Sequence, residues 1–321
     1  MGRKNKNGKR YRNRSIEEQF KFAVRKCFSE DMDKHSYKKQ NGYKMDYNVF
    51  SHSDKFNLYD MSRMLSNYIK ENHIEIKKIK DITPEIVKEY LDYSAKPHKS
   101  APNGCTKNTI DNYHERINKL AECSNRVYKV DLDYRDVERP KCNLEYIEKK
   151  GAGNAIPTDN LNKIREYGQA NRCQSSDVVE IISRFGCRRA EATYLNKSDV
   201  DIDRGIITFN NTKGGKPYTR ELKEEDKELF KNIIDKGYSE DNRLFTVQGD
   251  SVRKYMNDVQ ERLHLEHYTA HDIRRRCCQD YFDALRLDGA SREEAIELSS
   301  LYLNHGPDRE KLLAGSYIVL W

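Results

Sequence analysis

Apolar residues recur at three- and four-residue intervals through most of the first half of the chain, which is typical of helices that pack one face on a core. Ser15 and Glu18 have the spacing of a capping box, and a short amphipathic helix is predicted directly after Ser15. Residues 29–50 are polar and show no period, so we interpret them as a linker. Residues 1–50 are therefore expected to form a basic arm, one helix and a linker.

Three longer helices are predicted between residues 51 and 145. The first runs past Leu58 and Ile69, the second begins at Thr83 with a proline in its first turn, and the third runs past Ile110. Together they predict a small all-α domain over residues 51–148. A stretch containing Pro140 and the Gly-Ala-Gly at 151–153 is interpreted as the connection that follows it.

The second half mixes helical periods with one strand pair, and we expect it to form a domain over residues 149–321. Residues 206–209 and 217–222 flank the letters T-K-G-G-K, which is the pattern of a β-hairpin around a Gly-Gly turn. The remaining segments are predicted to be helical: 158–170, 175–185, 188–195, 223–236, 250–264, 270–287, 291–304 and 308 to the end. The predicted fold class is mainly α with a small β-hairpin or sheet.

The net charge of +7 lies entirely in the first fourteen residues. This arm holds seven basic side chains and no acidic one: Arg3, Lys4, Lys6, Lys9, Arg10, Arg12 and Arg14. In the rest of the chain 52 basic residues balance 52 acidic residues, so affinity for nucleic acid must come from local clusters. We favour DNA contact by the arm, through Arg3, Lys4, Arg10, Arg12 and Arg14; a disordered solubilising tail is the alternative.

Composition excludes several classes of protein. The mean hydropathy is −0.99, and the chain has neither an apolar run of membrane-spanning length nor the apolar segment of a signal peptide, so a cytoplasmic protein is expected, nucleoid-associated if the cell is prokaryotic. The eight cysteines form no C-x-x-C pair and are interpreted as reduced thiols. No metal site is predicted.

Basic residues of the second half gather in four short islands, although this half is acidic overall. They are Arg184 with Arg188 and Arg189; Lys213 with Lys216; His271 with Arg274, Arg275 and Arg276; and His305. An H-x-x-R pair at helical spacing presents both side chains on one face, which suits gripping a phosphate. Each island alone is weak, because a charged helix face is usually just solvated.

The order of these islands is specific. The motifs are G-C-R-R-A-E-A-T-Y-L at 186–195, the T-K-G-G-K hairpin, H-D-I-R-R at 271–275, L-N-H-G at 303–306 and S-Y-I at 316–318. In this order they resemble the catalytic domain of the tyrosine recombinases, also called phage-type integrases. The resemblance covers about residues 155–321, while residues 51–145 resemble the family's core-binding domain only in size, position and pattern.

The resemblance implies a catalytic set, with each motif residue carried over to its match. The matches are Arg188 and Arg274 as the two arginines, Lys213 as the hairpin lysine, His271 as the histidine of H-x-x-R, His305 as the later His/Trp position, and Tyr317 as the nucleophile. Glu191 matches a supporting acidic position and is expected to orient the site. Lys216 and Arg275 are expected to contact DNA.

The implied reaction is transesterification of a DNA phosphodiester through a covalent 3′-phosphotyrosine. Arg188 and Arg274 would hold the charge of the phosphorane, and His271 would take the proton of Tyr317. Lys213, with Lys216 as second choice, would protonate the leaving 5′ oxygen, and His305 would hydrogen-bond the phosphate. The resemblance implies no metal and no ATP, a homotetramer on two double-stranded DNA sites, and possible accessory DNA-bending or directionality proteins.

The sequence departs from the family pattern in the segment that leads to Tyr317. Asn304 replaces the usual glycine before His305, the interval to Tyr317 is about one helical turn longer, and four residues follow the tyrosine. Two rival classes stay open: a type IB topoisomerase or telomere resolvase, and a non-catalytic DNA-binding protein on the same fold.

Overall fold

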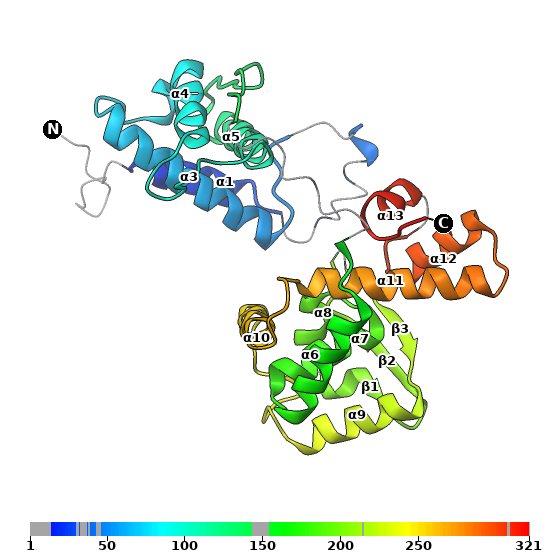
Figure 1. Cartoon of the computed structure of the whole chain (residues 1–321). Helices are drawn as coiled ribbons and strands as arrows, with labels where there is room; N and C mark the ends of the chain where they lie inside the picture. Colours follow the sequence, from blue (N-terminus) through cyan, green and yellow to red (C-terminus); the bar gives the residue numbers. More distant parts are fainter. Residues whose placement is uncertain are drawn as a thin grey trace. The chain divides into compact units, whose positions relative to one another are not determined.

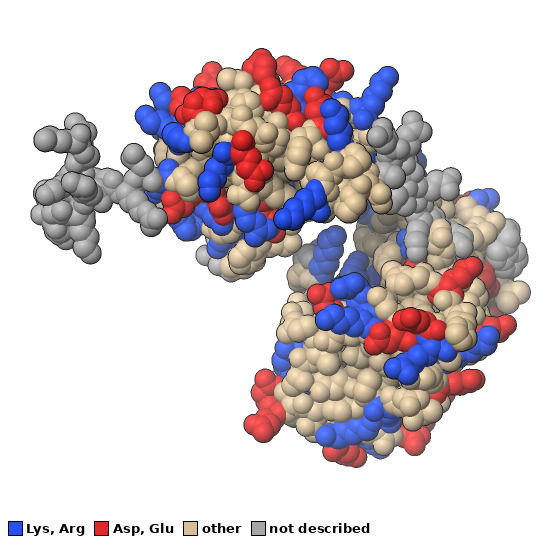
Figure 2. Space-filling view, turned by 60° about the vertical axis from the view of Figure 1, so that its left-hand side comes forward, with Lys and Arg blue, Asp and Glu red and all other residues tan. Residues whose placement is uncertain are grey.

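The computed structural model of the chain describes residues 14–29, 32, 37, 39–42, 46–142, 154–213, 215–306 and 309–320. The chain divides into two compact units, Met1–Ile147 and Glu148–Trp321, and each has its own hydrophobic core. Figure 2 shows basic and acidic side chains interspersed on the visible face of both units. This pattern agrees with the balance of charge beyond the arm.

The N-terminal unit is built from α1 (Ile16–Lys26), α3 (His52–Asn72), α4 (Pro84–Ala95) and α5 (Lys107–Tyr128), with a short 3-10 turn, η1 (Ile79–Asp81) (Figure 1). The predicted capping box is confirmed: Ser15 accepts from the Glu18 amide, and Glu18 accepts from the Ser15 amide. Thr83 caps α4, with Pro84 in its first turn, as expected.

Helix α1 lies inside this unit, although the sequence pattern suggested a segment apart from the helical domain. Its apolar face is fully buried against α3 and α5, with Phe20 only 1% exposed. The chain just before α3 is also tied to α1, because the Val49 amide donates to the Cys27 carbonyl at 2.9 Å and the Val49 carbonyl accepts from Ser29. The predicted domain boundary at residue 51 therefore separates α1 from α3 and α5, although the three helices share one core.

The C-terminal unit is mainly helical, and the predicted fold class is confirmed. Its helices are α6 (Thr158–Ala170), α7 (Gln174–Phe185), α8 (Arg189–Thr193), α9 (Glu224–Asp235), α10 (Gly249–Arg262), α11 (Ala270–Leu287), α12 (Arg292–Tyr302) and α13 (Glu310–Ser316). The predicted hairpin is present as β2 (Ile206–Phe209) and β3 (Tyr218–Glu221), with Thr208 opposite Thr219. Strand β1 (Val200–Asp201), after a 3-10 turn η3 (Lys197–Asp199), adds an antiparallel edge that the sequence pattern did not predict.

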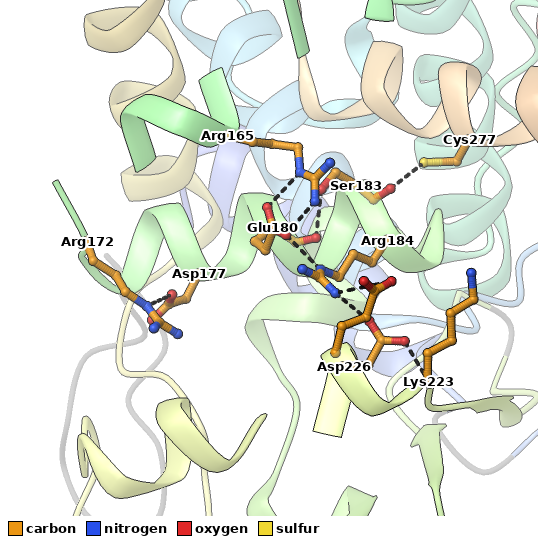
Figure 3. A network of polar contacts seen from close by, with 10 residues as sticks. Arg165, Arg172, Asp177, Glu180, Ser183, Arg184, Lys223, Asp226 and Cys277 are labelled. Carbon is orange, nitrogen blue, oxygen red and sulfur yellow. Dashed lines mark hydrogen bonds and ion pairs between the residues drawn. The ribbon is translucent and has the colours of Figure 1, made fainter. Parts of the chain in front are cut away.

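Helix α7 runs through the middle of this unit, and an ionic network holds its polar side (Figure 3). Glu180 accepts two hydrogen bonds from Arg165 of α6 and one from Arg184, and Arg184 also reaches Asp226 of α9 at 2.9 Å. The two arginines keep the pKa of Glu180 below its usual value despite its burial. Arg184 is therefore a structural residue that links α7 to α9.

A second small core at the C-terminal end fixes the segment that contains Tyr317. The second half of α11 packs against α12, which packs against α13, and the buried residues between them include Phe282, Leu313, Tyr317 and Ile318. The chain leaves the helical conformation after Ser316, so the helix predicted from 308 to the end covers only Glu310–Ser316. Among the described residues no helix is long and apolar enough to span a membrane.

Candidate active site

The first arginine motif folds into a tight turn between α7 and α8. Gly186 ends α7 at φ +58°, and a Cβ there would lie 3.2 Å from both Cys277 and the Tyr302 ring, so the backbone conformation and the close contacts both favour glycine. Arg188 caps α8, and its backbone amide and its Nη1 each donate to Glu191 at 2.7 Å. The three-residue spacing in the motif therefore lets one carboxylate hold both the backbone and the side chain of Arg188.

Glu191 joins three parts of the site. Besides Arg188 it accepts a 2.9 Å hydrogen bond from the hydroxyl of Tyr218 on β3, and its Oε2 lies 4.0 Å from Nη1 of Arg274. The side chains of Glu191 and Arg274 are each 1% exposed, whereas that of Arg188 is 24% exposed. The carboxylate is thus placed to orient two arginines, and the Arg188 guanidinium keeps an open side.

Arg274 extends from α11 into the protein and connects two loops. It donates to the carbonyl of Gly186 at the end of α7, and to the carbonyl of Leu303, two residues before His305, at 2.5 Å. Its buried Nε has no partner among the described residues. One guanidinium therefore fixes the Arg188 turn relative to the His305 turn.

The ring of Tyr317 lies between those of two histidines. Its centroid is 5.2 Å from His271 and 5.2 Å from His305, with both contacts edge-to-face, and Tyr317 is 4% exposed. The Nε2 atom of His305 is buried and makes no hydrogen bond among the described residues. Tyr302, the other tyrosine of this region, instead stacks on Tyr281 at 4.4 Å.

Burial and the charges of nearby arginines lower the pKa of both histidines. Desolvation by the surrounding protein, and then the charges of Arg275 and Arg274, lower the pKa of His271 to about 4, although the residue keeps an exposed side. Partial burial and then the charges of Arg274 and Arg188 lower the pKa of His305 to about 4. Both rings are therefore neutral near pH 7 and able to accept a proton or a hydrogen bond.

One face of α11 holds the Tyr317 segment at three successive positions. His271, Arg275 and Gln279 are four residues apart, which aligns them on one side of the helix. Arg275 Nε donates to the carbonyl of Ser316 at 2.8 Å. Gln279 accepts from the Val319 amide at 2.6 Å and donates to the Val319 carbonyl at 3.2 Å. The backbone is thus fixed on both sides of Tyr317.

The placement of Arg275 does not favour the predicted contact with DNA. The residue is 8% exposed, and its guanidinium is engaged with Asp272 at 2.5 Å as well as with Ser316. Consecutive residues on a helix point about 100° apart, so Arg275 does not share the direction of Arg274. Its charge is used inside the protein.

The hairpin lysines lie at an exposed turn. Lys213 and Lys216 are exposed, and the side chain of Lys213 makes no hydrogen bond or ion pair with the described part of the chain. Lys213 therefore lies on the hairpin as expected, but its amine contacts none of the other residues of the predicted catalytic set.

The basic arm lies mostly outside the described residues, which leaves out Arg3, Lys4, Arg10 and Arg12. Arg14 is described. Its guanidinium lies 3.8 Å from the ring centre of Phe22 on α1, and its carbonyl accepts from Gln19 at 3.0 Å. The root of the arm is therefore anchored on α1.

Sequence reasoning missed two polar residues that support this site: Tyr218 and Gln279. The spacing of eight residues places Gln279 on the same face of the predicted helix as His271, but it does not identify the segment that Gln279 contacts. Tyr218 stood at the start of a predicted strand, and nothing in the sequence indicated that its hydroxyl meets Glu191. The nearby thiols are core residues: Cys187 and Cys277 are buried, and burial raises the pKa of each.

Residues 155–284 match the model of the phage integrase family. A sequence search among curated proteins finds no match. Among solved structures, XerH site-specific recombinase bound to difH substrate is similar with a TM-score of 0.58 at 14% identity, covering 97% of this chain and 96% of that one. A lambda integrase dimer bound to a COC′ core site gives 0.58 at 11% identity, covering 85% and 90%.

The integrase of the Tn1549 transposon, in complex with transposon right end DNA, gives a TM-score of 0.53 at 16% identity and covers 87% of this chain and 92% of that one. At these identities the structural likeness establishes the fold. The family match includes Arg188, Glu191, Lys213, His271 and Arg274, and it ends before His305. Residues 155–284 therefore match the phage integrase family, and the described residues have the fold of the tyrosine recombinase structures.

Proposed function

We propose that the protein is a site-specific DNA recombinase that cuts and rejoins duplex DNA through a covalent 3′-phosphotyrosine on Tyr317. The observation that carries this proposal is the position of the Tyr317 ring, 5.2 Å from both His271 and His305. The charges of Arg188 and Arg274 act on both histidines, so the cationic groups and the nucleophile share one neighbourhood.

In the proposed reaction the hydroxyl oxygen of Tyr317 attacks the scissile phosphorus and the bond from phosphorus to the 5′ oxygen breaks. His271, neutral before the reaction, accepts the tyrosine proton, and Lys213 gives a proton to the departing 5′ oxygen. The products are a 3′-phosphotyrosine and a free 5′ hydroxyl. Attack by the 5′ hydroxyl of another strand reverses these steps and completes the exchange.

The negative charge of the phosphorane would be held by the two arginines. Arg188 has its open side for a non-bridging oxygen, and Glu191 limits the orientations of its guanidinium. His305 Nε2 would hydrogen-bond the same phosphate, which would satisfy an atom that is buried without a described partner. Because the phosphotyrosine conserves the energy of the broken ester, rejoining would need no ATP. The two arginines, the lysine and the histidines would supply the positive charge that a metal ion supplies elsewhere.

We further propose that the N-terminal unit and the arm bind double-stranded DNA, and that the active assembly is a tetramer. The solved structures of similar fold include a lambda integrase tetramer bound to a Holliday junction, at 13% identity and a TM-score of 0.57, covering 85% of this chain and 73% of that one. After Tyr317, the backbone of Val319 is hydrogen-bonded to Gln279 on α11 of the same chain.

A suicide-substrate assay tests the proposed function. Nicked duplexes tiled across the DNA that flanks the gene are incubated with the full chain, and covalent adducts are separated after denaturation. Wild type should form an adduct with duplexes that contain the recombination site, and Tyr317→Phe should form none. An adduct that persists in the variant, or plasmid relaxation without any specific site, would count against a site-specific recombinase that uses Tyr317.

A further inference from the structure

In the turn before His305, the backbone of Asn304 is left-handed, a conformation that glycine would adopt equally well. Asn304 has φ +51°, a region that asparagine tolerates better than most residues with a Cβ. The backbone on either side is fixed by hydrogen bonds from the Asn304 amide to Leu301 and from the His305 amide to Ser300. The backbone of this turn therefore does not by itself account for an asparagine side chain.

The side chain of Asn304 reaches the lysine hairpin. Its Nδ2 donates to the carbonyl oxygen of Lys216 at 3.1 Å. The same oxygen accepts from the Thr212 hydroxyl at 2.8 Å, and Thr212 and Lys216 are the two residues that flank the turn bearing Lys213. One carbonyl therefore closes the turn of the hairpin and also joins it to the His305 turn.

A second tie connects the strand of the hairpin to the same turn. Arg220 of β3 lies between the rings of Tyr218 and Tyr302, 4.7 Å and 4.8 Å from their centres, and donates to the Tyr302 carbonyl. Since Tyr218 also donates to Glu191, the strand is connected to the arginine motif as well. These contacts fix strand β3 of the hairpin, whereas Asn304 contacts the turn of the hairpin.

We propose that Asn304 is a positioning residue that couples the turn bearing Lys213 to the His305 turn, so that the hairpin is registered on the site before DNA arrives. This inference rests on the proposed function, because it assigns Asn304 an effect on the step in which Lys213 protonates the leaving oxygen. Its amide would act on that proton transfer and not on the attack by Tyr317.

Asn304→Gly separates the two roles of this position, because glycine keeps the left-handed backbone and removes only the amide. Cleavage is measured in single turnovers on two nicked duplexes of one sequence, chosen from those that wild type cleaves in the tiled set. One has the ordinary phosphodiester and the other a 5′-bridging phosphorothiolate. A thiol is several pKa units more acidic than an alcohol and leaves as the thiolate, so the second duplex does not need the acid.

The variant should cleave the ordinary duplex about 2- to 10-fold more slowly, the range that one neutral hydrogen bond supplies, and the phosphorothiolate at the wild-type rate. Lys213→Ala should show the same selectivity with a larger effect. His264→Gly is the matched control: His264 has φ +53° in the same unit, and none of its contacts among the described residues involves the hairpin, so neither rate should change.

Equal slowing of both substrates would overturn the inference, because Asn304 would then act on the site as a whole. Unchanged rates on both substrates would overturn it as well. Amide hydrogen exchange in the DNA-free protein gives a second measurement: residues 210–217 should exchange faster in Asn304→Gly than in wild type, and unchanged exchange there would contradict the tie. If wild type forms no adduct on any duplex of the tiled set, the proposed function fails first and this inference fails with it.

Discussion

Gln279 on α11 hydrogen-bonds both the amide and the carbonyl of Val319, two residues beyond Tyr317. This arrangement resembles the pairing of two backbone segments, except that one partner is a side chain 7% exposed in the core. Together with Arg275, which holds Ser316 on the other side, it fixes the segment that contains Tyr317 to the helix that carries His271 and Arg274.

Gln279→Ala should slow adduct formation by about thirtyfold, because it removes two hydrogen bonds worth together about 2 kcal/mol if their full effect appears in the cleavage step. The affinity for DNA should stay within twofold of wild type, since Gln279 is buried. Gln169→Ala, at an exposed position on α6, is the control. Single-turnover cleavage with a parallel binding titration measures both quantities, and wild-type cleavage by Gln279→Ala would show that Tyr317 is positioned by other groups.

Glu191→Gln should destabilise the C-terminal unit. The change keeps the size of the side chain and removes the charge that compensates Arg188 and Arg274, and breaking a buried ion pair by altering one partner costs about 3 kcal/mol. Urea unfolding measures this destabilisation. Glu228→Gln, on the exposed face of α9, should change the free energy of unfolding by less than about 0.5 kcal/mol. Equal midpoints for the two variants would contradict a role for Glu191 in holding the arginines.

The two histidines beside Tyr317 should titrate near pH 4 in the DNA-free protein, not near their ordinary value of 6.5. The unfolded chain then binds more protons than the folded chain between pH 6.5 and about 4, so the free energy of unfolding should fall as the pH is lowered through this window. Nuclear magnetic resonance of the ring protons, assigned with His271→Asn and His305→Asn, measures the two pKa values.

Binding of duplex DNA should raise both pKa values, because a phosphate in the site offsets the charges of the arginines. Titration of either ring near 6.5 without DNA would show that the ring is neither desolvated nor subject to the charges of the arginines. A pKa unaffected by DNA would show that the phosphate binds elsewhere.

Arg275→Ala should weaken folding while leaving the salt dependence of DNA binding unchanged. The side chain is buried against Asp272 and the Ser316 carbonyl, so it neutralises no phosphate. Removing residues 1–13 should instead reduce the slope of log affinity against log salt by about 0.9 for each phosphate that the arm neutralises. The slope is measured by fluorescence anisotropy at several salt concentrations. A shallower slope for Arg275→Ala would restore it as a DNA-binding residue.

Much of the fold was predictable because its signals are local. Three such signals each determine geometry within a few residues: the capping box at Ser15, the proline after Thr83 and the Gly-Gly hairpin. The first two are present where expected, and the strands of the hairpin are as well, while Gly214 of its turn lies outside the described residues. The packing of α1 was not predictable in the same way. A polar stretch separates it from α3, and the two come together through a shared apolar core and the pairing of Val49 with the end of α1.

The site shows the same division between local and non-local information. The three-residue spacing of Arg188 and Glu191 determines their contact, because it places the carboxylate at a capping position of α8. The longer interval before Tyr317 is taken up by α13, and the tyrosine still reaches both histidines. The roles of Gln279 and Arg275 depend on where the chain beyond α13 packs, which no pattern within α11 records.

Identifying the residue that becomes linked to DNA tests the role of Tyr317 as the nucleophile without any intermediate assumption. Wild-type adduct formed on a suicide duplex is digested with nuclease and then trypsin, and mass spectrometry identifies the modified peptide. Cleavage after Lys311 releases residues 312–321, and we expect a nucleotide-linked phosphotyrosine at Tyr317 in this peptide and none in Tyr317→Phe. A modification on the peptide that contains Tyr302, or on any other residue, would show that Tyr317 is not the nucleophile.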